Sequence, residues 1–144
     1  MCVQARRAYA ASTAAPAAAR QFGAAAVIAS ISPAGWNLAD DAALVISELV
    51  SSAVKAGATE LEVTLNLHRD RLEITVADDR QLLAPDPPAA TPPGSVDPGL
   101  QIVTALTSRR GARVAADGRT EVWAHLPCDP AATTNITCVE APAR

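Results

Sequence analysis

The strongest constraint on the fold is a change of hydrophobic period at Glu60. From there, apolar and polar residues alternate through two short segments that flank Arg69 and Asp70. The alternating apolar residues are Leu61, Val63, Leu65 and Leu67, followed by Leu72, Ile74 and Val76. Because successive side chains of a strand point to opposite faces, this pattern predicts a β-hairpin with one buried face. One-sided burial favours a mainly antiparallel sheet covered on one face by helices.

Two segments before this hairpin have a helical period of apolar residues. The first covers residues 13–31 and carries Pro16 in its first turn, where proline is tolerated. The second can be capped by Asp40 or Asp41 and is stopped by Gly57. Both are therefore expected to pack on the buried face of the sheet.

A proline-rich segment follows the hairpin and interrupts all periodicity. Residues 80–98 contain six of the eleven prolines of the chain, which excludes a regular helix or strand. Loops of this length are commonly lids or binding segments, although an idle insertion is the alternative. A short helix opening near Leu100 and stopping near Gly111 should come next. A second hairpin then turns at Asp117-Gly118.

The order of elements predicts a two-layer α+β sandwich with about three helices on one face of the sheet. Residues 1–12 have no clear pattern and are expected to be a loose lead-in. Residues 13–127 form the domain, with a lid at 80–98. Residues 128–144, rich in Ala, Pro and Thr, are expected to be a mobile tail.

Composition narrows the class of protein. The chain has 144 residues, enough for one domain, with 12 Lys+Arg against 15 Asp+Glu and a net charge of −3. This balance argues against a protein that grips nucleic acid directly and against a polybasic membrane binder. The three cysteines, Cys2, Cys128 and Cys138, are expected to be free thiols. With no signal-like segment and no membrane-spanning run, we expect a cytoplasmic protein.

Common catalytic motifs are absent from the sequence. It has no phosphate-binding Gly-rich loop ending in Gly-Lys-Ser/Thr, no Gly-x-Ser-x-Gly elbow and no His-Glu-x-x-His. His68 and His125 occur singly in strand-like segments. They are interpreted as solvated strand residues rather than as metal ligands or general bases.

Polar residues cluster instead at the boundaries of the expected elements. Four short motifs occur in order: ELVSSAV at 48–54, DDR at 78–80, DPGLQIV at 97–103 and DGRTEVW at 117–123. In this order they resemble the nucleotide boxes of the GHKL ATPases, the superfamily that includes the ATP-binding domains of gyrase and histidine kinases. The resemblance covers residues 13–127 and is strongest for the small, stand-alone anti-sigma-factor kinases of actinobacteria. It implies the Bergerat-like version of the α+β sandwich.

The resemblance also implies roles for individual residues. Glu48 holds the position of the general base that orients the group attacking the γ-phosphate. Asp78 would accept a hydrogen bond from the adenine amino group. Gly99, followed by Leu100, would let backbone N–H groups approach the phosphates at a helix N-terminus. Ser52 stands where the family has the asparagine that holds Mg²⁺. ATP and Mg²⁺ are thus the cofactors implied.

Several positions depart from the family pattern. Ser52 has a shorter side chain than asparagine and would need the ion closer to the helix. Arg80 replaces the glycine that lets adenine approach the strand end. Asp97 and Pro98 replace the first glycine of the phosphate loop and its neighbour, adding negative charge and removing an N–H donor. Together these changes predict weakened or lost nucleotide binding.

Two functions remain open at this point. The first is a GHKL-fold regulator that binds a sigma factor or an anti-sigma antagonist and so acts on transcription indirectly, without touching DNA itself. The second is an active Mg-ATP-dependent kinase that phosphorylates a serine of such an antagonist. A plain structural domain unrelated to the family is the third alternative. The resemblance also makes a homodimer plausible.

Overall fold

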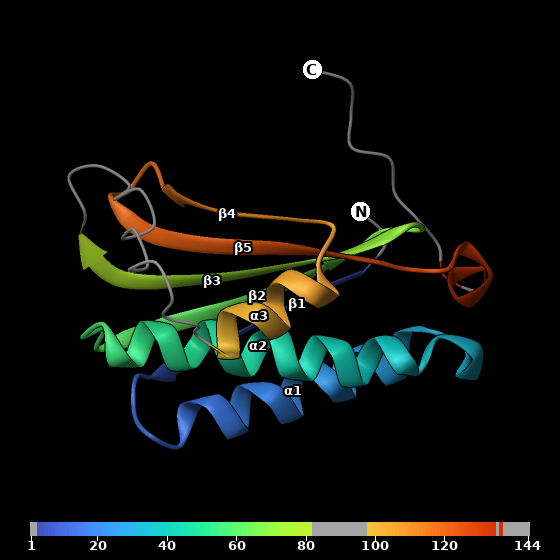
Figure 1. Ribbon diagram of the computed structural model, residues 1–144, viewed down its shortest axis with the longest axis horizontal. Coiled ribbons are helices and arrows are strands. Elements are labelled where there is room, and N and C mark those ends of the chain that lie inside the picture. The colour runs from blue at the N-terminus through green and yellow to red at the C-terminus, as the bar shows by residue number, and fades with distance from the viewer. Residues whose placement is uncertain (1–2, 82–97, 135, 137–144) are drawn as a thin grey trace.

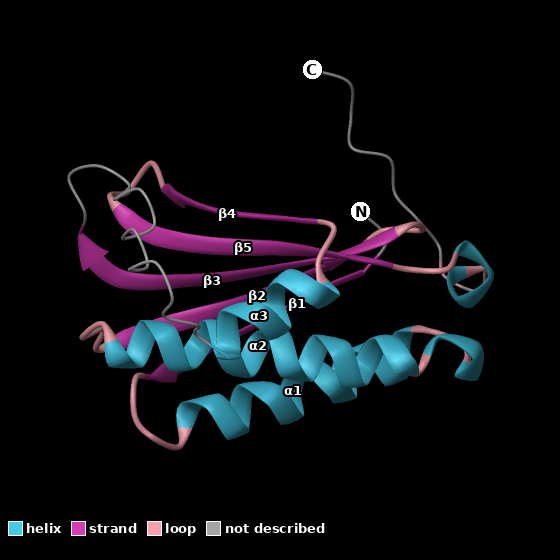
Figure 2. Cartoon of the chain, in the orientation of Figure 1, coloured by secondary structure: helices cyan, strands magenta, loops and turns pink. Residues whose placement is uncertain are grey.

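The fold is known from a computed structural model that describes residues 3–81, 98–134 and 136. Its five strands are β1 (Val3–Ala10), β2 (Glu60–Leu67), β3 (Arg71–Gln81), β4 (Arg109–Val114) and β5 (Arg119–Pro127). They form one antiparallel sheet in the order β1-β2-β3-β5-β4. The helices are α1 (Ala15–Ser30), α2 (Asn37–Lys55) and α3 (Pro98–Leu106), with short 3-10 turns η1 (Pro33–Gly35) and η2 (Pro130–Thr133). The three α-helices lie on the same side of the sheet (Figure 1, Figure 2), which confirms the predicted α+β architecture.

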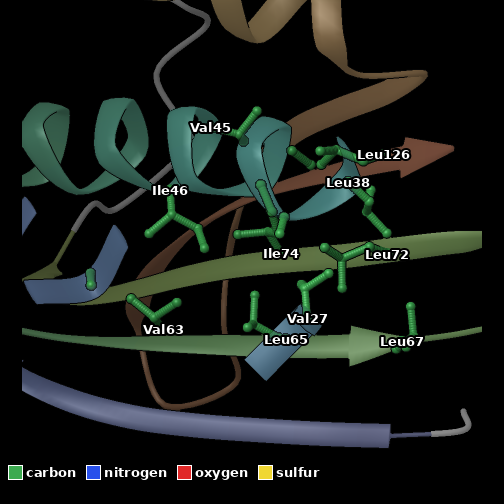
Figure 3. Close-up of a cluster of buried hydrophobic side chains, with 14 of the residues drawn as sticks. Val27, Leu38, Val45, Ile46, Val63, Leu65, Leu67, Leu72, Ile74 and Leu126 are labelled. Carbon is green, nitrogen blue, oxygen red and sulfur yellow. The ribbon is translucent and has the colours of Figure 1, made fainter. Parts of the chain in front are cut away.

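The core fills the layer between the sheet and the first two helices. Every alternating apolar residue of β2 is buried, and so are those of β3 from Leu72 to Val76. Ile46 of α2 reaches down toward Leu65 and Ile74 of the sheet (Figure 3). α1 can approach α2 closely because Gly23 lacks a side chain where Ile46 Cδ1 lies. The predicted hairpin and its buried face are confirmed.

Helix boundaries differ slightly from those expected. α2 begins at Asn37, not at a cap formed by Asp40 or Asp41, and Asp40 lies in its first turn. The chain enters the helix directly from η1, where the Trp36 N–H donates to the Pro33 carbonyl. α3 ends at Leu106 rather than near Gly111, because β4 already begins three residues later, at Arg109, and pairs with β5.

The expected loose lead-in over residues 1–12 is wrong. β1 pairs with β2 over its whole length, from Val3 opposite Leu67 to Ala10 opposite Glu60. An edge strand is covered on fewer sides, so its residues need not alternate as strictly as those of a central strand. The two adjacent arginines and the alanines of β1 therefore hid its period.

The expected tail at 128–144 is also wrong over its first part. Cys128 and Thr133 are buried, and Cys128 is a free thiol as predicted. The Thr133 hydroxyl donates to the Arg69 carbonyl at 2.8 Å, and the Ser32 N–H donates to the Ala132 carbonyl at 3.0 Å. These contacts make η2 part of the domain. Residues 135 and 137–144 lie outside the described residues.

The predicted irregular segment over residues 80–98 is wrong at both of its ends. Arg80 and Gln81 belong to β3, and Pro98 is the first residue of α3. Backbone pairing with β5 extends β3 beyond the hairpin pattern, which periodicity alone could not reveal. Residues 82–97 lie outside the described residues.

Candidate functional site

The candidate site lies at one end of the sandwich, where β3 and α2 both finish (Figure 1). The loop after α2 is tied to β3 there. The backbone N–H groups of Thr59 and Glu60 donate to Asp79 Oδ1 at 2.9 and 3.2 Å, and the Thr59 hydroxyl donates to Asp79 Oδ2. These hydrogen bonds bring the start of β2 and the end of β3 into one fixed arrangement.

The central feature of the site is a salt bridge between Asp78 and Arg80. Asp78 is fully buried, and the Arg80 side chain is 24% exposed. Arg80 Nε donates to Asp78 Oδ1 at 2.9 Å, Arg80 Nη2 donates to Asp78 Oδ2 at 2.8 Å, and the Arg80 backbone N–H also reaches Oδ1 at 2.9 Å. The hydrogen bonds from Arg80 to Asp78 raise the pKa of the guanidinium and keep it charged. Arg80 therefore occupies both oxygens of the carboxylate expected to bind adenine.

Strand geometry explains this pairing. Asp78 and Arg80 are two residues apart near the end of β3, and their side chains meet in a bidentate contact. The register of β3 against β5 shifts between Asp78 and Gln81, which lets the strand bend at this point. Thr120 of β5, opposite Asp78 and itself buried, donates its hydroxyl to the Arg80 carbonyl at 2.9 Å. Thr120 thus holds the backbone of Arg80 in place.

Sequence reasoning missed the roles of Thr120 and Thr59. It identified Arg80 as the replacement of the glycine that lets adenine approach the strand end, and the structure directs the Arg80 side chain onto Asp78. The Asp-x-Arg spacing on a strand was the available signal for the pair. No comparable signal in the sequence marks either threonine, because each contacts a residue of β3 that is distant in sequence: Thr59 contacts Asp79, and Thr120 contacts Arg80.

Asp79 has a structural role distinct from that of Asp78. Its carboxylate accepts hydrogen bonds from the Thr59 hydroxyl, then from the backbone N–H groups of Thr59 and Glu60, and these lower the pKa of Asp79 to about 2. Hydrogen bonds to an ionised carboxylate favour its charged form. The side chain thus closes the loop between α2 and β2.

This lowered pKa predicts an acid-sensitive loop. A carboxyl group whose pKa is depressed in the folded state stabilises the fold above its unfolded pKa of about 3.9, and this contribution is lost as the pH falls toward 2. Urea unfolding from pH 5 to pH 2 should show stability falling more steeply in the wild type than in Asp79→Asn. Thr59→Val removes one of the donors to Asp79, so the slope of its stability against pH should lie between those of the wild type and Asp79→Asn. Equal slopes in all three proteins would contradict this role of Asp79.

Glu48 and Ser52 lie one turn apart near the C-terminal end of α2. Glu48 is half-buried, and Ser52 is exposed. No side-chain hydrogen bond or ion pair of either residue involves another residue within the described ranges. The structure thus confirms their shared helix but joins neither of them to Asp78 by a direct contact.

α3 begins at Pro98 and places Gly99 and Leu100 in its first turn. This agrees with the expected helix opening after the proline-rich segment. α3 packs against α2, so its N-terminus and Ser52 belong to neighbouring elements. Asp97, expected to disturb the phosphate loop, lies outside the described residues.

The described residues do not fit a functional ATP site in this arrangement. Arg80 donates three hydrogen bonds to the buried Asp78 carboxylate, so an adenine amino group would have to compete with the guanidinium for this acceptor. Within residues 3–81 and 98–134, no group of three or more His, Cys, Asp or Glu side chains is placed to hold a metal ion. Ser52 would have to hold Mg²⁺ with donors from outside these ranges.

The two histidines lie together on the open face of the sheet. His68 Nε2 and His125 Nε2 approach Glu73 Oε1 at 3.2 and 3.7 Å, and Arg71 Nε donates to the same oxygen at 3.2 Å. Burial raises the pKa of Glu73, but His68, Arg71 and His125 lower it more. Burial lowers the pKa of His125. The histidines are thus partly buried partners of a carboxylate, not fully solvated residues as expected from the sequence.

The fold and site define a class: an antiparallel α+β sandwich with a buried Asp–Arg pair at the end of a central strand. Comparison with models of protein families and with curated proteins found no match for this chain. Among the helices of the described part, none has the length and apolar composition that crossing a membrane would require.

Proposed function

We propose that this chain is a regulatory protein of the GHKL ATPase type that acts by binding another protein, with its ATP binding weakened or lost. The partner class is a sigma factor or an anti-sigma antagonist, so the effect on transcription is indirect. The order of the four sequence motifs supports the family and the partner class. The observation that carries the loss of ATP binding is the Asp78–Arg80 pair.

The energetics of that pair oppose the binding of adenine. To bind as the resemblance implies, adenine would have to take the place of Arg80 on a carboxylate that is fully buried. A hydrogen bond to a charged group contributes about 1.5–3 kcal/mol. If adenine displaced one such hydrogen bond of Arg80 without fully replacing it, ATP would bind about ten- to hundredfold more weakly. Arg80 makes two such bonds through its side chain.

Calorimetric titration with ATP, with and without Mg²⁺, tests the loss of nucleotide binding. The wild type should release no binding heat at millimolar ATP. Arg80→Gly should bind ATP measurably, because it frees Asp78 and restores the glycine of the family pattern. Asp78→Asn in the Arg80→Gly background is the matched control and should lose the gained affinity, because the amide cannot offer the same acceptor pair.

Micromolar ATP binding by the wild type would contradict the proposal. It would favour the alternative of an active protein-serine kinase, in which Glu48 is the general base. Transfer of labelled phosphate to an anti-sigma antagonist, lost in Glu48→Ala, would establish that alternative. Partner binding is tested separately by pull-down of sigma factors and antagonists at micromolar concentration, and absence of any such partner would contradict the regulatory role.

A further inference from the structure

The free edge of the sheet at β1 has the features of a peptide-binding surface. β1 is eight residues long and pairs only with β2, so its outer side has no strand partner among the described residues. Such an edge presents unpaired N–H and C=O groups to any extended chain that approaches it. Proteins commonly protect long edges or use them to bind an added strand.

This edge is basic, although the chain as a whole is acidic. The sequence has no Asp or Glu before Asp40, and in this region it has Arg6, Arg7 and Arg20. Arg6 and Arg7 lie in the middle of β1 and are exposed. Arg20 lies on α1, which packs beside β1. An approaching strand would therefore meet positive charge, in contrast to the net charge of −3 of the whole molecule.

The two arginines of β1 project to opposite faces of the sheet. Arg7 is opposite the buried Val63 and therefore points to the helix side, where its guanidinium lies over the Phe22 ring, 5.1 Å from the centroid. Arg6 points to the open side, and its Nε is 3.6 Å from Glu62. The Arg6 side chain is still 58% exposed, and Arg7 has no ion pair with any described residue.

An apolar pocket adjoins the same edge. It is small, with a volume of about 20 Å³, roughly the space of one water molecule, and lies between the first half of β1 and the end of α1. Val3 and Ala5 of β1 line it together with Val27 and Leu65. Both β1 residues point to the helix side, so helix-side residues of an added strand opposite them would lie at this pocket.

We propose that the β1 edge binds an extended acidic segment of a partner protein as a sixth strand. In antiparallel pairing, the segment would have an acidic residue opposite Arg7, an acidic residue opposite Arg6, and apolar residues opposite Ala5 and Val3. Read from its N-terminus, it is acidic, acidic, apolar, any residue, apolar. The inference deepens the proposed function by naming the binding surface, and it is independent of the state of the nucleotide site.

A second copy of this chain fits the edge less well. Antiparallel pairing of two β1 strands about their middle would bring the arginines of one copy next to those of the other. Like charges placed directly opposite each other on neighbouring strands are destabilising. The charge on the edge therefore favours an acidic partner over self-pairing.

The test uses a fluorescein-labelled peptide with the core Glu-Asp-Val-Thr-Ile, flanked by Gly and Thr, and the full chain. Anisotropy should show saturable binding that weakens as NaCl is raised, because exposed charge pairs are screened by salt. The Gln-Asn version of the peptide should bind about two- to thirtyfold more weakly. Amide hydrogen exchange of the wild-type complex should slow on β1 and not on β4.

Variants of the protein provide the matched comparison. Arg6→Glu/Arg7→Glu should weaken binding of the acidic peptide about tenfold or more and should instead prefer a Lys-Lys version. Arg110→Glu, on the opposite edge strand β4, should change affinity less than about twofold. The variant can prefer the Lys-Lys peptide only if β1 is still folded. This reversed preference therefore shows that the weaker binding of the acidic peptide comes from the changed charge and not from unfolding.

Three results would overturn the proposal. The first is equal affinity for the acidic and neutral peptides. The second is binding without slowed exchange on β1. The third is a dimer, seen by sedimentation of the free chain, that the Arg6→Glu/Arg7→Glu variant dissociates. None of these results bears on the ATP titration, and capture of a sigma factor could still succeed.

Discussion

Arg80→Ala should lower the free energy of unfolding by about 2–4 kcal/mol. Asp78 is fully buried and would lose both side-chain donors of Arg80, and among the described residues it would keep the backbone N–H of residue 80 as a donor. An unpaired buried charge is costly, and this cost exceeds the intrinsic value of the pair. The expected loss extends below the about 3–5 kcal/mol of a fully buried pair because the Arg80 side chain is 24% exposed. Urea unfolding at neutral pH measures the change.

A surface ion pair provides the control for Arg80→Ala. Arg113 and Glu121 approach to 2.7 Å, but the Arg113 side chain is 57% exposed. Arg113→Ala should therefore cost less than about 1 kcal/mol. The double variant Asp78→Ala/Arg80→Ala should recover part of the stability lost in Arg80→Ala, because it removes the stranded charge. Additive losses in the double variant would show that the two side chains are not coupled.

Ile46→Ala should lower the free energy of unfolding by about 2–5 kcal/mol. Ile46 is fully buried and fills the space between α1, α2 and the sheet (Figure 3). Its loss removes transfer free energy and leaves a cavity that the backbone of two packed helices cannot easily close. The measurement is again urea unfolding, and a change below about 1 kcal/mol would contradict the packing described.

Gly23 provides an internal check on the same contact. A Cβ at residue 23 would overlap Ile46 Cδ1, so Gly23→Ala should destabilise the wild type by about 1–3 kcal/mol. In the Ile46→Ala background the same substitution should be neutral or stabilising, because the new methyl group enters the cavity. Two residues in contact are expected to depart from additivity in this way. If the changes in the free energy of unfolding of the two single variants simply added up in the double variant, the contact between residue 23 and Ile46 would be contradicted.

Much of the fold could be predicted from local patterns. The alternation from Leu61 to Val76 was sufficient for the first hairpin, and helical spacing was sufficient for α2. A strand or helix whose one face is buried must repeat its apolar residues at its own period, so the pattern survives in the sequence. β1 escaped this reasoning because an edge strand with adjacent arginines has no such requirement. η2 escaped because its burial depends on contacts with Arg69 and Ser32.

The candidate site could likewise be predicted only in part. The sequence placed Glu48 and Ser52 on one helix face and Asp78 at a strand end, since each of these depends on neighbours within a few residues. Only the tertiary structure decided what the Asp78 carboxylate contacts. The register shift of β3 against β5 and the Thr120 hydroxyl orient Arg80 toward Asp78.

The chain by itself therefore determined its class of fold and the positions of its polar boundary residues, because period and turn chemistry act locally. The tertiary structure decided which strand forms the basic free edge and which carboxylate is closed by an arginine. Both depend on pairing between segments distant in sequence: β1 with β2, and β3 with β5. Such pairings follow from the packing of the whole domain, which no single segment encodes.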